Sequence, residues 1–298
     1  MTMRKIAFYS QKGGTGKTTS CLNIGGALAA MGRRVLIVDL DSNACASRTF
    51  DCIVGGGQSV AAALRGDASL AGVIRSLPVP NLWLAPGGTE LRVLHVPGVV
   101  ADPDRLDEAG VLRADVLALE LAQLGDDAFD YILLDCPGGN PYMDQVALLA
   151  CDEVIVPTGL SVYDLYGATP SLQFIALARQ AQGNGRPRFL GFLPSGAGKA
   201  GVPPRLQEKL DSYNAPCFTP VRQSATLKTI AGMPEVGQRL IVLTRPDNPA
   251  AQSYLQIARE IEMGIEAAQA MMAALSNEGN APTQISAGVE ATAVGGEG

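Results

Sequence analysis

The sequence predicts an α/β fold of three layers, in which a mostly parallel central sheet carries helices on both faces. Short continuous apolar runs at residues 35–38, 131–134 and 154–156 are typical of strands buried on both faces of such a sheet. Longer segments with helical periodicity separate these runs, and strands that alternate with helices indicate βαβ units with right-handed crossovers. A glycine-rich loop at residues 11–17 stands where a first strand should pass into a first helix.

The elements are expected in the following order along the chain. A strand at residues 4–10 leads into the glycine-rich loop, and a helix then runs from Thr18 to Met31, with Gly32 as its stop. The three apolar runs follow as strands, and residues 189–193 form a further candidate strand. Helices are expected at residues 103–124, 161–182 and 249–275.

Length and composition indicate one large domain. The chain has 298 residues, 47% of them hydrophobic and 17% charged, which is a globular composition. We expect a single domain over residues 1–275. Residues 276–298 are rich in Asn, Gly, Ala and Thr and have almost no large apolar side chains, so they are predicted to form a disordered tail.

Charge and cysteine usage narrow the classes of partner and site. The formal net charge is -6, so contact with DNA needs basic residues that gather locally. The six cysteines include no C-x-x-C pair, which argues against zinc and iron–sulfur sites. The N-terminus resembles no signal peptide and no apolar run is long enough to span a bilayer, so a cytoplasmic location without membrane attachment is expected.

The strongest motif is the loop Gln-Lys-Gly-Gly-Thr-Gly-Lys-Thr-Thr at residues 11–19. Glycines allow successive backbone N–H groups to surround phosphate oxygens, and the following helix adds its positive dipole end. Lys17 should reach the β- and γ-phosphates of a nucleotide, and the Thr18 hydroxyl should bind Mg²⁺. The predicted ATP-binding residues of this loop are Lys12, Gly13, Gly14, Thr15, Gly16, Lys17, Thr18 and Thr19.

Two acidic motifs follow apolar strands. Asp39 and Asp41 flank one residue at the end of the second strand, where two carboxylates on an extended chain point the same way. Asp135 ends the strand at 131–134, a Walker B pattern that holds Mg²⁺ directly or through water. Open parallel sheets bind ligands at this carboxyl edge, so the loop and all three carboxylates are expected to meet there.

These motifs together resemble the ParA/MinD family of deviant Walker A P-loop ATPases, and ParA-type partition ATPases most closely. The pattern K-G-G-x-G-K-T at residues 12–18 carries the resemblance, which extends over residues 3–262. Two of the motifs depart from the family pattern: Ser42-Asn43 replace Pro-Gln in one, and Gly138 replaces a second proline in the other.

The resemblance implies hydrolysis of ATP to ADP and phosphate with Mg²⁺. It implies that Lys12 reaches the nucleotide of a second subunit in an ATP-dependent sandwich dimer. By the same resemblance Asp41 positions the attacking water, Asp39 supports the Mg²⁺ shell through water, and Pro220 cradles the adenine. The catalytic set is thus Lys12, Lys17 and Asp41, and the metal set is Thr18, Asp39 and Asp135.

The resemblance also implies macromolecular partners. ParA dimers bind DNA without sequence preference through basic residues in the C-terminal third, where this chain has Arg222, Lys228, Arg239 and Arg245. A ParB-like or other cargo adaptor would stimulate hydrolysis, so that the cycle partitions or positions a plasmid, chromosome or other cargo on the nucleoid.

Three alternatives remain open. One is a metabolic ATP-dependent ligase of the same P-loop class, which a second set of convergent polar motifs would favour. Another is a MinD-like positioning ATPase, which differs by a basic C-terminal amphipathic helix, whereas the tail here is acidic. The third is an adaptor that binds ATP without turnover, against which Lys12, Lys17 and Asp41 argue.

Overall fold

The computed structural model describes residues 3–55 and 57–270, so the tail predicted at 276–298 lies outside the described residues. Eight strands form one sheet in the order β3-β4-β2-β5-β1-β6-β7-β8, and every neighbouring pair is parallel except β3–β4. The strands are β1 (Arg4–Phe8), β2 (Val35–Asp39), β3 (Arg75–Ser76), β4 (Leu82–Ala85), β5 (Tyr131–Asp135), β6 (Glu153–Thr158), β7 (Arg188–Ala197) and β8 (Val221–Arg222).

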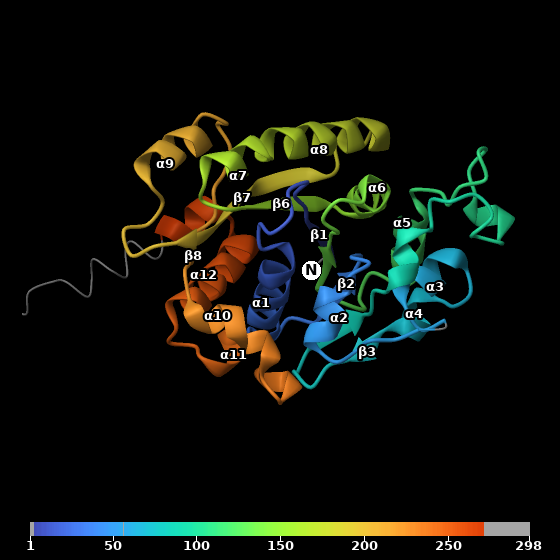
Figure 1. Ribbon diagram of the computed structural model, residues 1–298, viewed down its shortest axis with the longest axis horizontal. Helices are drawn as coiled ribbons and strands as arrows, with labels where there is room; N and C mark the ends of the chain where they lie inside the picture. The colour runs from blue at the N-terminus through green and yellow to red at the C-terminus, as the bar shows by residue number, and fades with distance from the viewer. Residues whose placement is uncertain (1–2, 56, 271–298) are drawn as a thin grey trace, which may run out of the picture.

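Helices cover both faces of this sheet, which confirms the predicted three-layer α/β class (Figure 1). One layer holds α1 (Lys17–Ala30), α10 (Ala225–Thr229), α11 (Ile241–Thr244) and α12 (Pro249–Met263). The other holds α6 (Pro141–Ala150), α7 (Val162–Tyr166), α8 (Ala168–Gln182) and α9 (Pro204–Asp211). A group beside the β3–β4 end comprises α2 (Cys45–Thr49), α3 (Val60–Arg65), α4 (Leu70–Val73) and α5 (Val116–Ala122), with short 3-10 turns η1 (Thr89–Arg92) and η2 (Pro103–Arg105).

The central strands are apolar throughout because both of their faces are covered. Every residue of β2 and β5 is buried, and alternate side chains enter two separate cores. Ile37 and Leu133 face α1, whereas Leu36 and Leu134 face the α5–α6 side. At Gly25 of α1 an added Cβ would lie 3.1 Å from Ile37 Cδ1, so the predicted small face of this helix allows close packing on the sheet.

Three predicted helices are shorter than their sequence patterns indicated. The helix expected at 103–124 is wrong in its first half, because Asp107 Oδ1 accepts backbone N–H bonds from Ala109 and Val111 and closes a turn there. The segment 161–182 breaks at Gly167 into α7 and α8. Gly264, with φ 90°, ends α12 after Met263 within the expected 249–275 helix.

Candidate functional site

The three sequence motifs meet at one edge of the sheet. β5 lies between β1 and β2, and Asp135 is in register with both Phe8 and Asp39. The glycine-rich loop therefore leaves β1 directly beside the two carboxylates that end β2 and β5. As Figure 1 shows, α1 runs from this edge beneath the sheet, so its N-terminus points at the same place.

The loop at residues 11–16 is built to surround an anion. Gly14 and Gly16 have φ of 75° and 89°, which a side chain disfavours. No side chain caps the start of α1 and no acidic residue lies in its first turn, so its N–H groups and positive dipole end stay available. Gln11 N donates to Ser171 Oγ at 3.1 Å, which ties the loop to α8.

Lys17 lies inside the loop and is only 7% exposed. Its Nζ donates to the carbonyl oxygens of Ser10 at 3.0 Å and of Lys12 at 3.2 Å. A buried ammonium group needs such acceptors, and phosphate oxygens would be stronger ones because they are charged. The loop thus holds Lys17 where the oxygens of a bound phosphate could replace the two carbonyl groups as acceptors of its Nζ.

Asp135 is fully buried, and neither carboxylate oxygen has a hydrogen-bond partner among the described residues. Burial, and then the charge of Asp39, raise its pKa well above the usual value, while the nearby Thr18 hydroxyl opposes the rise. An unpaired buried carboxylate is costly, and a divalent cation relieves that cost. The described residues contain no group of three His, Cys, Asp or Glu side chains able to hold a metal alone, so a Mg²⁺ ion here would draw further ligands from water, phosphate and the Thr18 hydroxyl.

Asp39 differs from Asp135 because its oxygens are already used. Oδ2 accepts from Ser47 N at 2.9 Å and Ser47 Oγ at 2.6 Å, and Oδ1 accepts from Asp41 N at 3.1 Å. Burial raises the pKa of Asp39 to about 6, although these hydrogen bonds oppose the shift. Asp39 therefore organises the loop that carries Asp41. Ser47 supports Asp39 in this role, and no sequence motif indicated it.

Asp41 stands half-buried at the start of a tight turn. Its Oδ1 accepts from Asn43 N at 2.8 Å, whereas Oδ2 has no hydrogen-bond partner among the described residues. A carboxylate held on one oxygen and free on the other is suited to accept a proton from a water molecule.

Lys12 occupies the outer rim of the site, where its Nζ forms an ion pair with Asp164 of α7. Ser161 fixes Asp164 in a capping box, donating from its backbone N at 2.9 Å and from Oγ at 2.6 Å. Burial raises the pKa of Asp164, but the hydrogen bonds from Lys12 and Ser161 outweigh it and hold the pKa below its usual value. The ammonium group of Lys12 is thus held by α7 of its own chain, while its backbone carbonyl oxygen accepts from Lys17 Nζ.

One buried carboxylate of the site was missed at the level of sequence. Asp144 on α6 is 3% exposed, and its Oδ1 has no partner in the described chain. Burial raises the pKa of Asp144 to about 7, while the charge of Lys17 lowers it. The sequence offered no signal because Asp144 belongs to no motif and lies in the first turn of an ordinary apolar helix.

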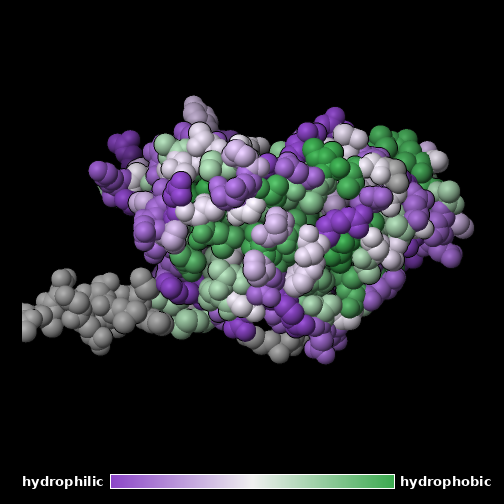
Figure 2. Space-filling model, turned by 90° about the horizontal axis from the view of Figure 1, so that it is seen from below, coloured by the Kyte–Doolittle hydropathy of each residue, from purple (hydrophilic) through white to green (hydrophobic). Residues whose placement is uncertain are grey.

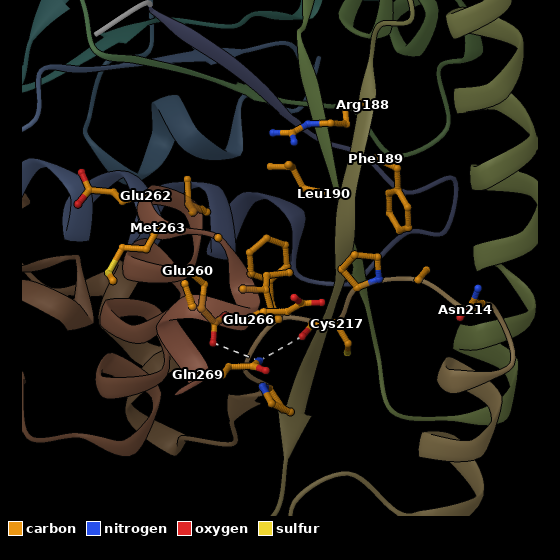
Figure 3. Close-up of a pocket in the computed structure, with 18 of the residues that line it drawn as sticks. Arg188, Phe189, Leu190, Asn214, Cys217, Glu260, Glu262, Met263, Glu266 and Gln269 are labelled. Carbon is orange, nitrogen blue, oxygen red and sulfur yellow. Dashed lines mark hydrogen bonds between the residues drawn. The ribbon is translucent and has the colours of Figure 1, made fainter. Parts of the chain in front are cut away.

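Pro220 precedes Val221, which pairs with Ser195 of β7, and a Cβ added at Gly16 of the phosphate loop would lie 3.5 Å from Ser195 Oγ, so the role of Pro220 in cradling adenine stays a prediction. Pro220 precedes β8 and lines a cavity of about 1140 Å³ between the start of β7 and the end of α12. Figure 3 shows Glu260, Glu262 and Glu266 around this cavity, where Gln269 Nε2 donates to the Cys217 carbonyl oxygen at 3.4 Å and to Glu260 Oε1 at 3.5 Å. No residue of the glycine-rich loop lines it.

The four basic residues predicted to contact DNA have different environments. Arg222 and Lys228 line a cavity of about 650 Å³ at the ends of β7 and β8, together with Lys199 and no acidic residue. Arg239 is largely buried and donates to Asp51 Oδ1 at 2.8 Å and to the Thr49 carbonyl oxygen at 3.0 Å. Arg245 is exposed just after α11.

Comparisons with known proteins agree with this geometry. A family model described as an AAA domain matches residues 3–185. The chain is 30% identical over 269 residues to the chromosome-partitioning ATPase Soj of Thermus thermophilus, covering 89% of this chain and 98% of that protein. The Soj ATPase of Treponema pallidum is 33% identical over 172 residues, covering 58% of this chain and 63% of that protein, which is less than two thirds of its length.

Two solved structures are similar over most of the chain. The septum site-determining protein MinD of Pyrococcus horikoshii, complexed with Mg-ADP, has a TM-score of 0.67 at 25% identity and covers 88% of this chain and 96% of that one. Cobyrinic acid a,c-diamide synthase of Mycobacterium smegmatis, with a bound ATP analogue and magnesium, has a TM-score of 0.67 at 26% identity, with coverages of 88% and 97%. Within the described part of the chain, no helix is long and apolar enough to cross a membrane.

Proposed function

The chain belongs to the ParA/MinD family of deviant Walker A P-loop ATPases, and we propose that it is a ParA-like ATPase whose active site is completed by a second copy of the chain. MgATP is its ligand. The ATP-dependent dimer binds DNA without sequence preference and positions a cargo, and an adaptor protein stimulates hydrolysis.

The residues of the loop perform distinct tasks in this scheme. Backbone N–H groups of residues 13–17 and the N-terminus of α1 bind the phosphates. Lys17 exchanges its two carbonyl acceptors for β- and γ-phosphate oxygens. Thr18 and Asp135 would hold Mg²⁺, which supplies charge neutralisation on the phosphates when bound.

Asp41 orients the attacking water through its free Oδ2 and accepts a proton from it. Asp39 keeps Asp41 in place through the bond between Asp39 Oδ1 and Asp41 N. These two roles explain why the two carboxylates have different surroundings. Both oxygens of Asp39 accept hydrogen bonds, whereas Asp41 accepts a hydrogen bond on Oδ1 and leaves Oδ2 for water.

The placement of Lys12 is the observation that carries the dimer proposal. Its side chain is 35% exposed, and its Nζ is paired with Asp164 of α7 rather than with a residue of the glycine-rich loop. An ion pair this exposed contributes between 0 and about 1 kcal/mol, so a partner's triphosphate can displace Asp164 at little cost. Lys12 would then supply positive charge to the γ-phosphate of the other subunit.

The proposed DNA surface is the cluster of Lys199, Arg222 and Lys228. Arg245, which is exposed and precedes α12 in the chain, is a further candidate contact. A cavity rim with three basic and no acidic residues can bind phosphate although the whole chain is acidic. Figure 2 shows the face seen from below the sheet, on which hydrophobic patches are interrupted by hydrophilic residues. Arg239 would support this region by holding Asp51 rather than by reaching DNA itself.

Cytoplasmic, nucleoid-associated localisation follows from this scheme as part of the proposal. The cargo adaptor would recognise the ATP-bound dimer, because only that state joins two subunits across the phosphate loops. A ParB-like protein fits this role.

The proposal is tested with the Asp41→Ala protein, which should bind ATP and turn it over very slowly. With ATP but not ADP, we expect a dimer in light scattering and binding to random duplex DNA at about 50 mM salt that weakens sharply by about 200 mM. Arg222→Ala with Lys228→Ala should lower DNA binding and leave the dimer intact, and Arg113→Ala is a matched surface control. An ATP-bound dimer with no affinity for DNA would refute DNA as the matrix.

A metabolic ligase is the second candidate, favoured by the similarity to the diamide synthase. Such an enzyme should hydrolyse one ATP for each carboxylic acid substrate that it converts. Its rate of ATP hydrolysis should not change when DNA or an adaptor protein is added. Turnover stimulated by DNA together with an adaptor would reject this candidate.

A further inference from the structure

The loop that carries Asp41 is held in a strained turn. The Asp41 carbonyl oxygen accepts from Ala44 N at 2.8 Å, while Asp41 Oδ1 accepts from Asn43 N at 2.8 Å. Ala44 closes the turn with φ 51°, in the left-handed region that side chains disfavour. Such a conformation persists only where neighbouring groups over-determine it.

Arg92 provides the outer support of this turn. Its Nε donates to Ser42 Oγ at 3.0 Å and its Nη2 donates to Asn43 Oδ1 at 2.9 Å. The planar guanidinium thereby bridges both residues that follow Asp41. From the other side, Arg48 Nε donates to the Asn43 carbonyl oxygen at 2.9 Å.

The segment that ends in Arg92 is itself fixed to the same loop. Gly87 N donates to Ser47 Oγ at 2.9 Å, and Ser47 Oγ in turn donates to Asp39. An added Cβ at Gly87 would lie 2.8 Å from the Asp39 carbonyl oxygen, so the two backbones are in close contact. In the loop that runs from Asp39 to Ser47, Gly87 therefore contacts both ends, and Arg92 bonds to the turn in its middle.

We infer that Arg92 is a positioning residue for hydrolysis, which fixes the Ser42–Asn43 turn and thereby aims the free Oδ2 of Asp41. Arg92 acts on Asp41 through this turn, and its side-chain hydrogen bonds go to Ser42 and Asn43 rather than to the phosphate loop. The inference rests on the proposed role of Asp41. It assigns to Arg92, nearly fifty residues further along the chain, a part in the geometry of water attack.

The test is steady-state ATP hydrolysis by full-length Arg92→Gln. Loss of two exposed hydrogen bonds should shift the turn equilibrium and lower kcat about five- to tenfold, with KM for ATP within about twofold. Arg92→Lys, which keeps the charge but cannot bridge both acceptors, should fall between this variant and the wild type. Arg113→Ala, which removes an exposed pair with Asp115, should leave kcat unchanged.

The decisive arm repeats Arg92→Gln in an Asp41→Asn background, where the rate is measured in single turnover. A residue that acts through Asp41 should cause no further loss there. An equal loss in both backgrounds, an unchanged kcat, or a rise in KM alone would overturn the inference. If Arg92→Gln fails to fold, the double change Ser42→Ala with Asn43→Ala removes the same two acceptors and should give the same loss of kcat.

The same measurements separate this inference from the proposed function. Full turnover in the Asp41→Asn single variant would refute the role of Asp41 itself. Slow turnover in Asp41→Asn together with normal turnover in Arg92→Gln would refute only the role of Arg92.

Discussion

Asp135→Asn should make the nucleotide-free protein more stable and should strongly reduce the stabilisation by MgATP. Asp135 is fully buried, and both of its carboxylate oxygens lack a hydrogen-bond partner among the described residues. An asparagine has the same shape as this aspartate but cannot ionise. It remains a buried polar group, but the cost of a buried carboxylate charge, about 1–3 kcal/mol, is removed. For a chain of this size each kcal/mol raises Tm by about 2–4 °C, so an increase of about 2–12 °C is expected.

Asp39→Asn is the matched control, since it changes the same residue type at the same sheet edge. Asp39 accepts three hydrogen bonds from Ser47 and Asp41, and an amide would turn one acceptor into a donor facing donors. The expected change is a loss of about 1–3 kcal/mol. The two neighbouring substitutions should therefore move Tm in opposite directions.

The assay is thermal unfolding with and without MgATP. Wild-type protein should gain stability on adding the ligand at about 100 times its Kd, by about 2.7 kcal/mol. Asp135→Asn should gain much less. Nucleotide-free Asp135→Asn that melts below the wild type, with an undiminished response to MgATP, would refute the interpretation of Asp135 as a cation ligand.

Three further predictions concern other parts of the molecule. The pKa of Asp144 is raised to about 7, so the folded state binds its proton more tightly than the unfolded chain, and stability is lost as pH rises from about 4 to about 7. In denaturant titrations, the free energy of unfolding of Asp144→Asn should therefore match that of the wild type near pH 4 and exceed it above pH 7 by up to about 4 kcal/mol. A constant difference across this pH range would contradict the assignment. In Gly26→Ala the added Cβ would lie 2.7 Å from Leu240 Cδ1, so unfolding experiments should show a loss of about 1–3 kcal/mol, and no loss would mean that α1 packs less tightly than described. Asp164→Asn should release Lys12 and tighten the ATP-dependent dimer about two- to fivefold in sedimentation, whereas weaker dimerisation would show that Asp164 itself contacts the partner.

The parts of the fold that follow local rules were predictable. Apolar runs buried on both faces became β2, β5 and β6, and the glycine-rich loop stood between a strand and a helix as its motif required. The helix at 103–124 was overestimated because the turn at Asp107 depends on side-chain bonds to the backbone, which periodicity does not encode.

The site was predictable where one motif carries one task. Lys17, Asp39, Asp41 and Asp135 were all expected at one edge, and strand register brings their segments together there. The residues that hold them in place, such as Ser47, match no sequence pattern, so only the tertiary structure identifies them. Whether Asp39 contacts the Mg²⁺ shell stays a prediction.

The central claim, that Lys12 serves the active site of a second subunit, is tested most directly by mixing two inactive variants. Lys12→Ala lacks the lysine that should reach across, and Asp41→Ala lacks its own water-positioning carboxylate. In a mixed dimer, the Lys12→Ala subunit retains Asp41 and receives Lys12 from its Asp41→Ala partner. An equal mixture should therefore recover about a quarter of wild-type ATPase activity, because half of the dimers are mixed and each has one complete site. A mixture that forms mixed dimers, as labelled subunits would report, and yet hydrolyses no ATP would show that Lys12 acts within its own chain.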